Sequence, residues 1–76
     1  MINLEKYKIT EDILKINDIK SICVLEETFL DPIENEFKSK FPPLLIIKNM
    51  GSDIKEIKGE SEIINYLNEI KSAALN

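Results

Sequence analysis

Residues 40–51, KFPPLLIIKNMG, are the stretch that decides the fold expected for this chain. Pro42 and Pro43 stand directly before four branched aliphatic residues, and turn-forming residues follow at 49–53. Proline cannot donate a backbone hydrogen bond, so it is tolerated at the entry of a strand, and it also ends a preceding helix. Four apolar residues in a row predict a strand that is covered on both faces, at residues 44–47. We therefore expect a buried strand that begins directly after a helix.

Two elements are predicted upstream of this stretch. Residues 21–25, SICVL, form another apolar run and predict a second strand covered on both faces, as in a parallel or mixed sheet. The sequence DPIE at residues 31–34 is the best helix start in the chain, with Asp as the cap and Pro at the first helical position. Apolar residues then recur at every fourth position, so we expect a helix over residues 31–41.

The two ends of the chain complete the expected order. Residues 1–9 alternate imperfectly and give a weak strand signal, and Thr10 is a candidate cap for a short helix. Residues 54–58 are more polar and predict an edge strand, where lysines discourage aberrant pairing. Ser61 is a candidate cap for the last helix, in which one stripe holds Ile63, Tyr66, Leu67, Ile70 and Ala74. The predicted order is strand, helix, strand, helix, strand, strand, helix.

The composition limits the function. Seventy-six residues suffice for a single domain, residues 1–76. The net charge is −4 and all ten basic residues are lysines, so the chain is poorly equipped for nucleic acid, which favours the guanidinium fork. We expect no membrane span, because no apolar run is long enough, and a cytoplasmic location, because charges occupy the N-terminus where a signal peptide would be apolar. The bias toward Ile, Lys and Asn is typical of an AT-rich genome, bacterial or viral.

The residue types leave little room for catalysis. The chain has one cysteine, Cys23, and no histidine. The absence of histidine excludes Cys-His and Ser-His catalytic pairs and His-ligated metals. Glu26 and Glu27 are adjacent and would point to opposite faces of a strand, so they would not converge as an acid–base pair. We expect no catalytic residue, no cofactor and no metal.

Residues 42–51, PPLLIIKNMG, with Gly59 before an amphipathic helix, resemble the thioredoxin/glutaredoxin-like superfamily, and the best-matched part is residues 31–70. The resemblance implies a small α/β three-layer sandwich in βαβαββα order, with a mixed sheet and helices on both faces. A second alignment is possible, in which residues 21–27 are the family's first strand and residues 31–41 its first helix.

The chain departs from the family at its redox motif. The stretch equivalent to the family's CxxC is residues 7–11, which hold no cysteine, and in the second alignment the loop at 27–30 holds none either. Thiol–disulfide exchange needs an attacking thiolate there. Cys23 lies among apolar neighbours, so we expect it to be a buried core residue.

The resemblance therefore implies a redox-inactive protein-binding or assembly module that acts through the loop around a cis-proline. The residues implied for partner binding are Phe41, Pro42, Pro43, Tyr7 and Thr10. The Phe41–Pro42 bond is the preferred cis bond, and two trans prolines that simply end a helix are the alternative.

The alternatives are a thiol–disulfide oxidoreductase relative that uses Cys23, a carboxylate-dependent hydrolase, or a structural component of a larger complex. The protein partner is not specified by the sequence. A homodimer through the edge at residues 54–58 or through an uncovered helix is a further expectation, because so small a core gains from association.

Overall fold

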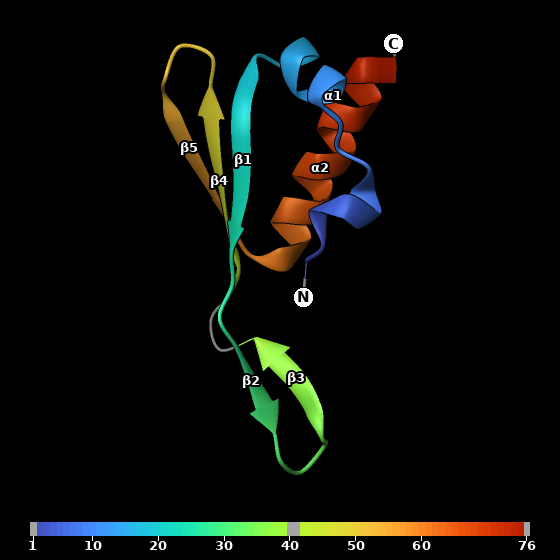
Figure 1. Cartoon of the computed structure of the whole chain (residues 1–76), viewed down its shortest axis with the longest axis vertical. Helices are drawn as coiled ribbons and strands as arrows, with labels where there is room; N and C mark the ends of the chain where they lie inside the picture. The colour runs from blue at the N-terminus through green and yellow to red at the C-terminus, as the bar shows by residue number, and fades with distance from the viewer. Residues whose placement is uncertain (1, 40–41, 76) are drawn as a thin grey trace.

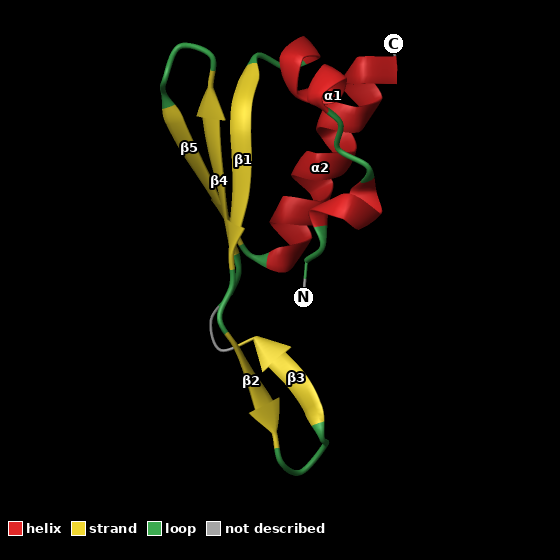
Figure 2. Ribbon diagram, viewed as in Figure 1, coloured by secondary structure: helices red, strands yellow, loops and turns green. Residues whose placement is uncertain are grey.

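The computed structural model describes residues 2–39 and 42–75 and consists of a compact α/β body from which a β-hairpin extends (Figures 1 and 2). The elements in chain order are η1 (Leu4–Tyr7), α1 (Glu11–Ile16), β1 (Ile19–Leu25), β2 (Thr28–Asp31), β3 (Glu36–Ser39), β4 (Leu44–Asn49), β5 (Ile54–Lys58) and α2 (Glu60–Leu75).

The body is a three-stranded antiparallel sheet in the order β1-β4-β5, with α1 and α2 on one of its faces (Figure 1). Leu45 lies opposite Val24 and Ile57, and these side chains face the helices. The opposite face carries no helix in the described part of the chain. The buried core is small and lies between sheet and helices; it consists of Ile19, Leu45, Ile47, Ile63, Leu67 and Ile70.

Helix α2 covers the sheet because its apolar residues repeat with helical spacing, as predicted. Gly59 precedes it with a φ of 97°, a left-handed conformation that glycine adopts without strain, and its N–H donates to the carbonyl of Pro43 at 2.9 Å. The helix begins at Glu60, so Ser61 lies inside the first turn instead of capping it.

Helix α1 begins as predicted, because the Thr10 hydroxyl accepts a hydrogen bond from the N–H of Ile13 at 3.3 Å. It ends at Ile16, and the capping residue Asn17 follows. The side-chain amide of Asn17 donates to the carbonyl of Ile13 at 2.8 Å and to that of Ile70 at 3.0 Å. Asn17 therefore ties the end of α1 to α2, far away in the sequence.

The hairpin of β2 and β3, residues 28–39, is named the arm. It forms a separate two-stranded sheet that projects from the body and gives the molecule extents of 45 × 24 × 17 Å (Figure 2). Its turn is held by Asp31, whose Oδ1 accepts from the N–H groups of Ile33 at 2.8 Å and Glu34 at 3.3 Å. Asn35 then takes a φ of 54°, and the chain returns as β3.

The expected three-layer sandwich is wrong. Both sheets are antiparallel, the helices lie on one face only, and the order is not βαβαββα. The strand predicted at residues 1–9 is not formed by the described residues 2–9: residues 4–7 form a 3₁₀ helix, and the side chain of Asn3 caps its start by accepting a hydrogen bond from the N–H of Glu5 at 3.0 Å. Lys8 ends it with a left-handed φ of 54°.

The predicted helix from residue 31 is also wrong, for a local reason. Asp31 binds N–H groups as a helix cap does, but Asn35 in the left-handed conformation prevents the turn from propagating, and extended residues follow. Neither alignment to the thioredoxin/glutaredoxin-like superfamily therefore has the helix that it implied at this place. The strands predicted at residues 21–25, 44–47 and 54–58 are confirmed as parts of β1, β4 and β5.

Candidate interaction surfaces

Two of the residues predicted to bind a partner have structural roles in the described chain. Thr10 caps α1, Tyr7 packs against the core from η1, and Pro43 is buried before β4, while Pro42 is exposed. Phe41 lies outside the described residues, and so does the predicted cis bond between Phe41 and Pro42. No cis peptide bond occurs among the residues that are described. The surface predicted around the prolines stays a prediction, because Phe41 lies outside the described residues and Pro42 is exposed.

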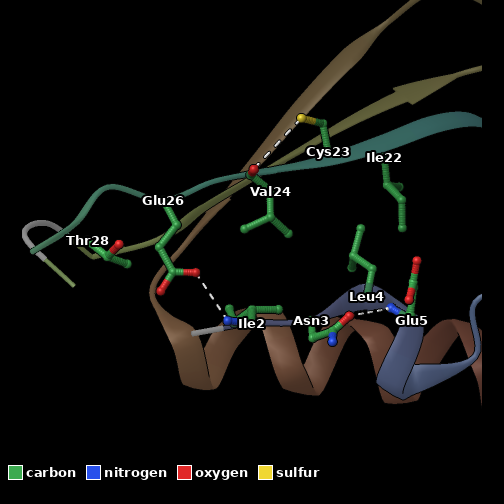
Figure 3. Close-up of a pocket in the computed structure, with 9 residues that line it drawn as sticks. All are labelled: Ile2, Asn3, Leu4, Glu5, Ile22, Cys23, Val24, Glu26 and Thr28. Carbon is green, nitrogen blue, oxygen red and sulfur yellow. Dashed lines mark hydrogen bonds between the residues drawn. The ribbon is translucent and has the colours of Figure 1, made fainter. Parts of the chain in front are cut away.

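Cys23 is exposed, which corrects its predicted place in the core. In β1 the side chains of Ile22 and Val24 point toward the helices and that of Cys23 points away (Figure 3). An apolar run was interpreted as covered on both faces, but the sheet is covered on one. The thiol makes one weak contact, at 3.9 Å to the carbonyl of Val24. Within residues 2–39 and 42–75 no group of three or more His, Cys, Asp or Glu side chains could hold a metal ion.

A hollow named the β1 groove lies between residues 2–5 and β1 (Figure 3). It is an open groove of about 620 Å³. Its apolar floor is formed by Ile2, Leu4, Ile22 and Val24, and its polar rim by Asn3, Glu5, Glu26 and Thr28. It lies beside β1 on the face that the helices cover, where Ile22 and Val24 point, and no described residue of β4 lines it (Figure 3).

One hydrogen bond crosses the β1 groove at the end nearest the arm. The N–H of Ile2 donates to Oε2 of Glu26 at 3.1 Å, which ties the N-terminal segment to the residue that follows β1 (Figure 3). Glu26 and Thr28 therefore connect the groove directly to the base of the arm.

The arm displays apolar side chains that nothing in the described chain covers. Phe29, Leu30, Ile33 and Phe37 are 45%, 51%, 92% and 64% exposed. Leu30 lies opposite Phe37 and shares one face with it, whereas Phe29 lies opposite Lys38 on the other. Single exposed apolar residues are ordinary, and four on one short hairpin make the arm a candidate contact surface. An isolated two-stranded hairpin is also marginally stable by itself.

Charged groups brace the tip of the arm. The Lys38 ammonium lies 3.1 Å from Asp31 and 2.8 Å from Glu34. The N–H of Ile33 and then the Lys38 ammonium lower the pKa of Asp31, and Lys38 lowers the pKa of Glu34. Glu34 and then Asp31 raise the pKa of Lys38. Residues 26–39 hold five carboxylates and one lysine, a net charge of −4, which equals that of the whole chain.

A smaller hollow of about 280 Å³ lies beside Tyr66, between β5 and α2. The ammonium of Lys55 lies 5.3 Å from the centroid of its ring, a cation–π contact. Partial burial and then the charge of Glu69 raise the pKa of the Tyr66 phenol. This contact packs β5 onto α2 and brings together no reactive pair.

Comparisons with protein-family models, curated proteins and solved structures find no match to this chain. The relationship to the thioredoxin/glutaredoxin-like superfamily stays a hypothesis. No helix in the described residues is long and apolar enough to cross a membrane.

Proposed function

We propose that this chain is a non-catalytic protein-interaction module that binds its partner by strand pairing along the outer edge of β1. The observation that carries the proposal is the β1 groove, which runs beside an end strand that no described strand pairs on that side. The unpaired N–H and C=O groups of such an edge accept an added strand, and flanking pockets take its alternate side chains. Protein binding without catalysis is also what the resemblance implied, but the surface proposed here is the edge of β1 and not the loop around Pro42.

The two edges of the sheet differ in a way that favours β1. Edge strand β5 carries Lys55, Glu56 and Lys58, charges of the kind that discourage pairing with another chain. Residues 21–25 of β1 carry no charge. Its floor side chains Ile22 and Val24 are half-buried, and an added strand would complete their burial.

The residue types of the chain support a non-catalytic role. A sequence with no histidine and a single thiol lacks the usual nucleophile–base pairs.

Affinity capture from the organism that encodes the chain tests this function. The matched baits are the wild type, Cys23→Lys in β1, and Ile54→Lys in β5; both replaced residues are exposed. We expect the wild type and Ile54→Lys to retain the same protein and Cys23→Lys to lose it. Equal capture by all three baits would contradict binding at the β1 edge.

A further inference from the structure

We infer that the strand added to β1 is strand β2 of a second copy of this chain, so that two chains exchange their arms reciprocally. The inference rests on the proposed function and names its partner. Each arm would extend the sheet of the other chain, giving the strand order β5-β4-β1-β2-β3, in which the last two strands belong to the second copy.

The connectivity of the strands allows the two copies to form a closed two-fold dimer. β1 and β2 follow each other along one side of a long ribbon, and β4 and β3 lie along the other side. A two-fold axis near residues 26–27 would place β1 of each chain antiparallel to β2 of the other. Both pairings form at once, and the same surface serves both copies, as closed two-fold dimers require. A third copy could not pair in the same way, because the outer edges of β1 and β2 would both be occupied.

The apolar surfaces match in kind. The arm displays Phe29, Leu30 and Phe37 with no cover, and the β1 groove displays an apolar floor with no occupant among the described residues. Side chains of an added β2 would alternate between the two faces of the sheet. One set would enter the β1 groove beside Ile22 and Val24, and the other would extend the bare face beside Cys23.

The accessible area of a single chain also fits a half-dimer. A compact protein of 8.8 kDa is expected to expose about 4,800 Å², whereas this chain exposes 5623 Å². The excess, about 800 Å², is what one partner buries in an interface of standard size. The radius of gyration, 14.0 Å, likewise exceeds the value of about 11 Å expected for a compact chain of this length. The arm accounts for both excesses, because it projects from the body.

The charges are complementary. Antiparallel pairing brings the tip of the arm, with Asp31, Glu34 and Glu36, to the start of β1 in the second copy. Lys20 lies there on β1, with Lys48 one strand away opposite Ser21. Because residues 26–39 carry the whole net charge of −4, the rest of the chain is neutral, and the tip of an arm meets no net negative charge on the body of the second copy.

Two other modes of self-association are outcomes of the test. One is pairing through β5. The other is face-to-face packing of the bare side of the sheet, where Leu25 is 52% and Ile54 is 65% exposed and Ile46 lies opposite Cys23. Both would depend on Ile54, which arm exchange does not use, whereas Cys23→Lys would weaken bare-face packing as well as arm exchange.

Light scattering on a size-exclusion column, over a series of protein concentrations, measures the mass. We expect the wild type and Ile54→Lys to reach twice 8.8 kDa. We expect Cys23→Lys and the arm variant Leu30→Ser/Phe37→Ser to remain monomers. Circular dichroism verifies that each variant is folded. A wild type that is monomeric throughout would overturn arm exchange, and so would a dimer that Ile54→Lys disrupts, whether or not Cys23→Lys disrupts it too.

This result is distinguishable from a failure of the proposed function. A monomeric wild type that captures another protein through an intact β1 edge, and loses it in Cys23→Lys, overturns arm exchange and leaves the proposed function in place. A dimer that persists in both Cys23→Lys and the arm variant overturns arm exchange, and equal capture by all three baits overturns the proposed function as well.

Discussion

Leu30 and Phe37 lie directly opposite each other in the β2–β3 ladder, yet they are 51% and 64% exposed, and neither belongs to the core. The arm therefore adds nothing to the core of the body. We predict that replacing residues 28–39 by Asn-Gly leaves the far-UV spectrum of the α/β body and its unfolding midpoint nearly unchanged. The same deletion is expected to abolish self-association. A deletion variant that does not fold would show that the arm stabilises its own body.

The core depends instead on α2. Leu67 is fully buried, so Leu67→Ala leaves a cavity and is expected to cost about 2–5 kcal/mol in the free energy of unfolding. In so small a domain this is a large part of the total stability. Leu75→Ala, at an 85% exposed position of the same helix, is the control and is expected to change stability by less than about 0.5 kcal/mol. Urea unfolding followed by circular dichroism compares the two, and equal effects would contradict the described core.

The side chain of Asn17 joins α1 to α2. Asn17→Ala removes both hydrogen bonds, to the carbonyls of Ile13 and Ile70, and is expected to destabilise the chain by about 1 kcal/mol or more. Asn17→Asp should be worse than Asn17→Ala, because a carboxylate cannot donate to these carbonyls and would repel them. Thermal unfolding of the three proteins gives the order of stability; an Asp variant as stable as the wild type would be inconsistent with the bridge.

The stability of the turn in the arm should depend on pH. The folded arm lowers the pKa of Asp31, so its contribution is present above the ordinary Asp range and is lost as the pH falls through the lowered value. The raised pKa of Lys38 acts at the other end: its contribution is present below the ordinary Lys range and is lost as the pH rises through the raised value. Amide chemical shifts of residues 28–39 report the transition. Asp31→Asn should lose much of the chemical-shift change at low pH. An unchanged low-pH transition in that variant would contradict its attribution to Asp31.

The exposure of Cys23 makes its reactivity testable. We predict that DTNB labels the thiol in the native state of a dilute sample, at a rate close to that in denaturant. This reverses the expectation from the sequence, where Cys23 was predicted to be buried. Arm exchange would slow the labelling as the protein concentration rises, because the arm of the second copy would lie next to β1. Slow labelling at every concentration would mean that the thiol is covered within a single chain.

Local signals of this sequence predicted local structure well. Thr10 caps α1, residues 44–47 and 54–58 form strands, and the stripe with Ile63 and Leu67 is buried, because each depends on a cap or a period within a few residues. The Asp-Pro start at residue 31 is different. It satisfies N–H groups equally well in a helix and in a hairpin turn, and the conformation of Asn35 decided between them.

The candidate surface could not be predicted in the same way. Apolar runs such as residues 21–25 predict burial on both faces, but a sequence does not say whether the second cover comes from the same chain. Ile33 and Phe37 were interpreted as the stripe of a helix, and they lie on the arm instead. A β-prone TFL before the Asp-Pro turn was the signal that could have indicated a hairpin.

An engineered disulfide tests arm exchange most directly. Antiparallel pairing around residues 26–27 places native Cys23 of one chain beside residues 28–30 of the other. Thr28→Cys, Phe29→Cys and Leu30→Cys are compared with Ile54→Cys under mild oxidation, followed by non-reducing electrophoresis and mass mapping. The account predicts a dimer linked between Cys23 and at least one of the three arm positions, and none through position 54. Cross-linking through position 54, or no arm cross-link faster than that control, would contradict it.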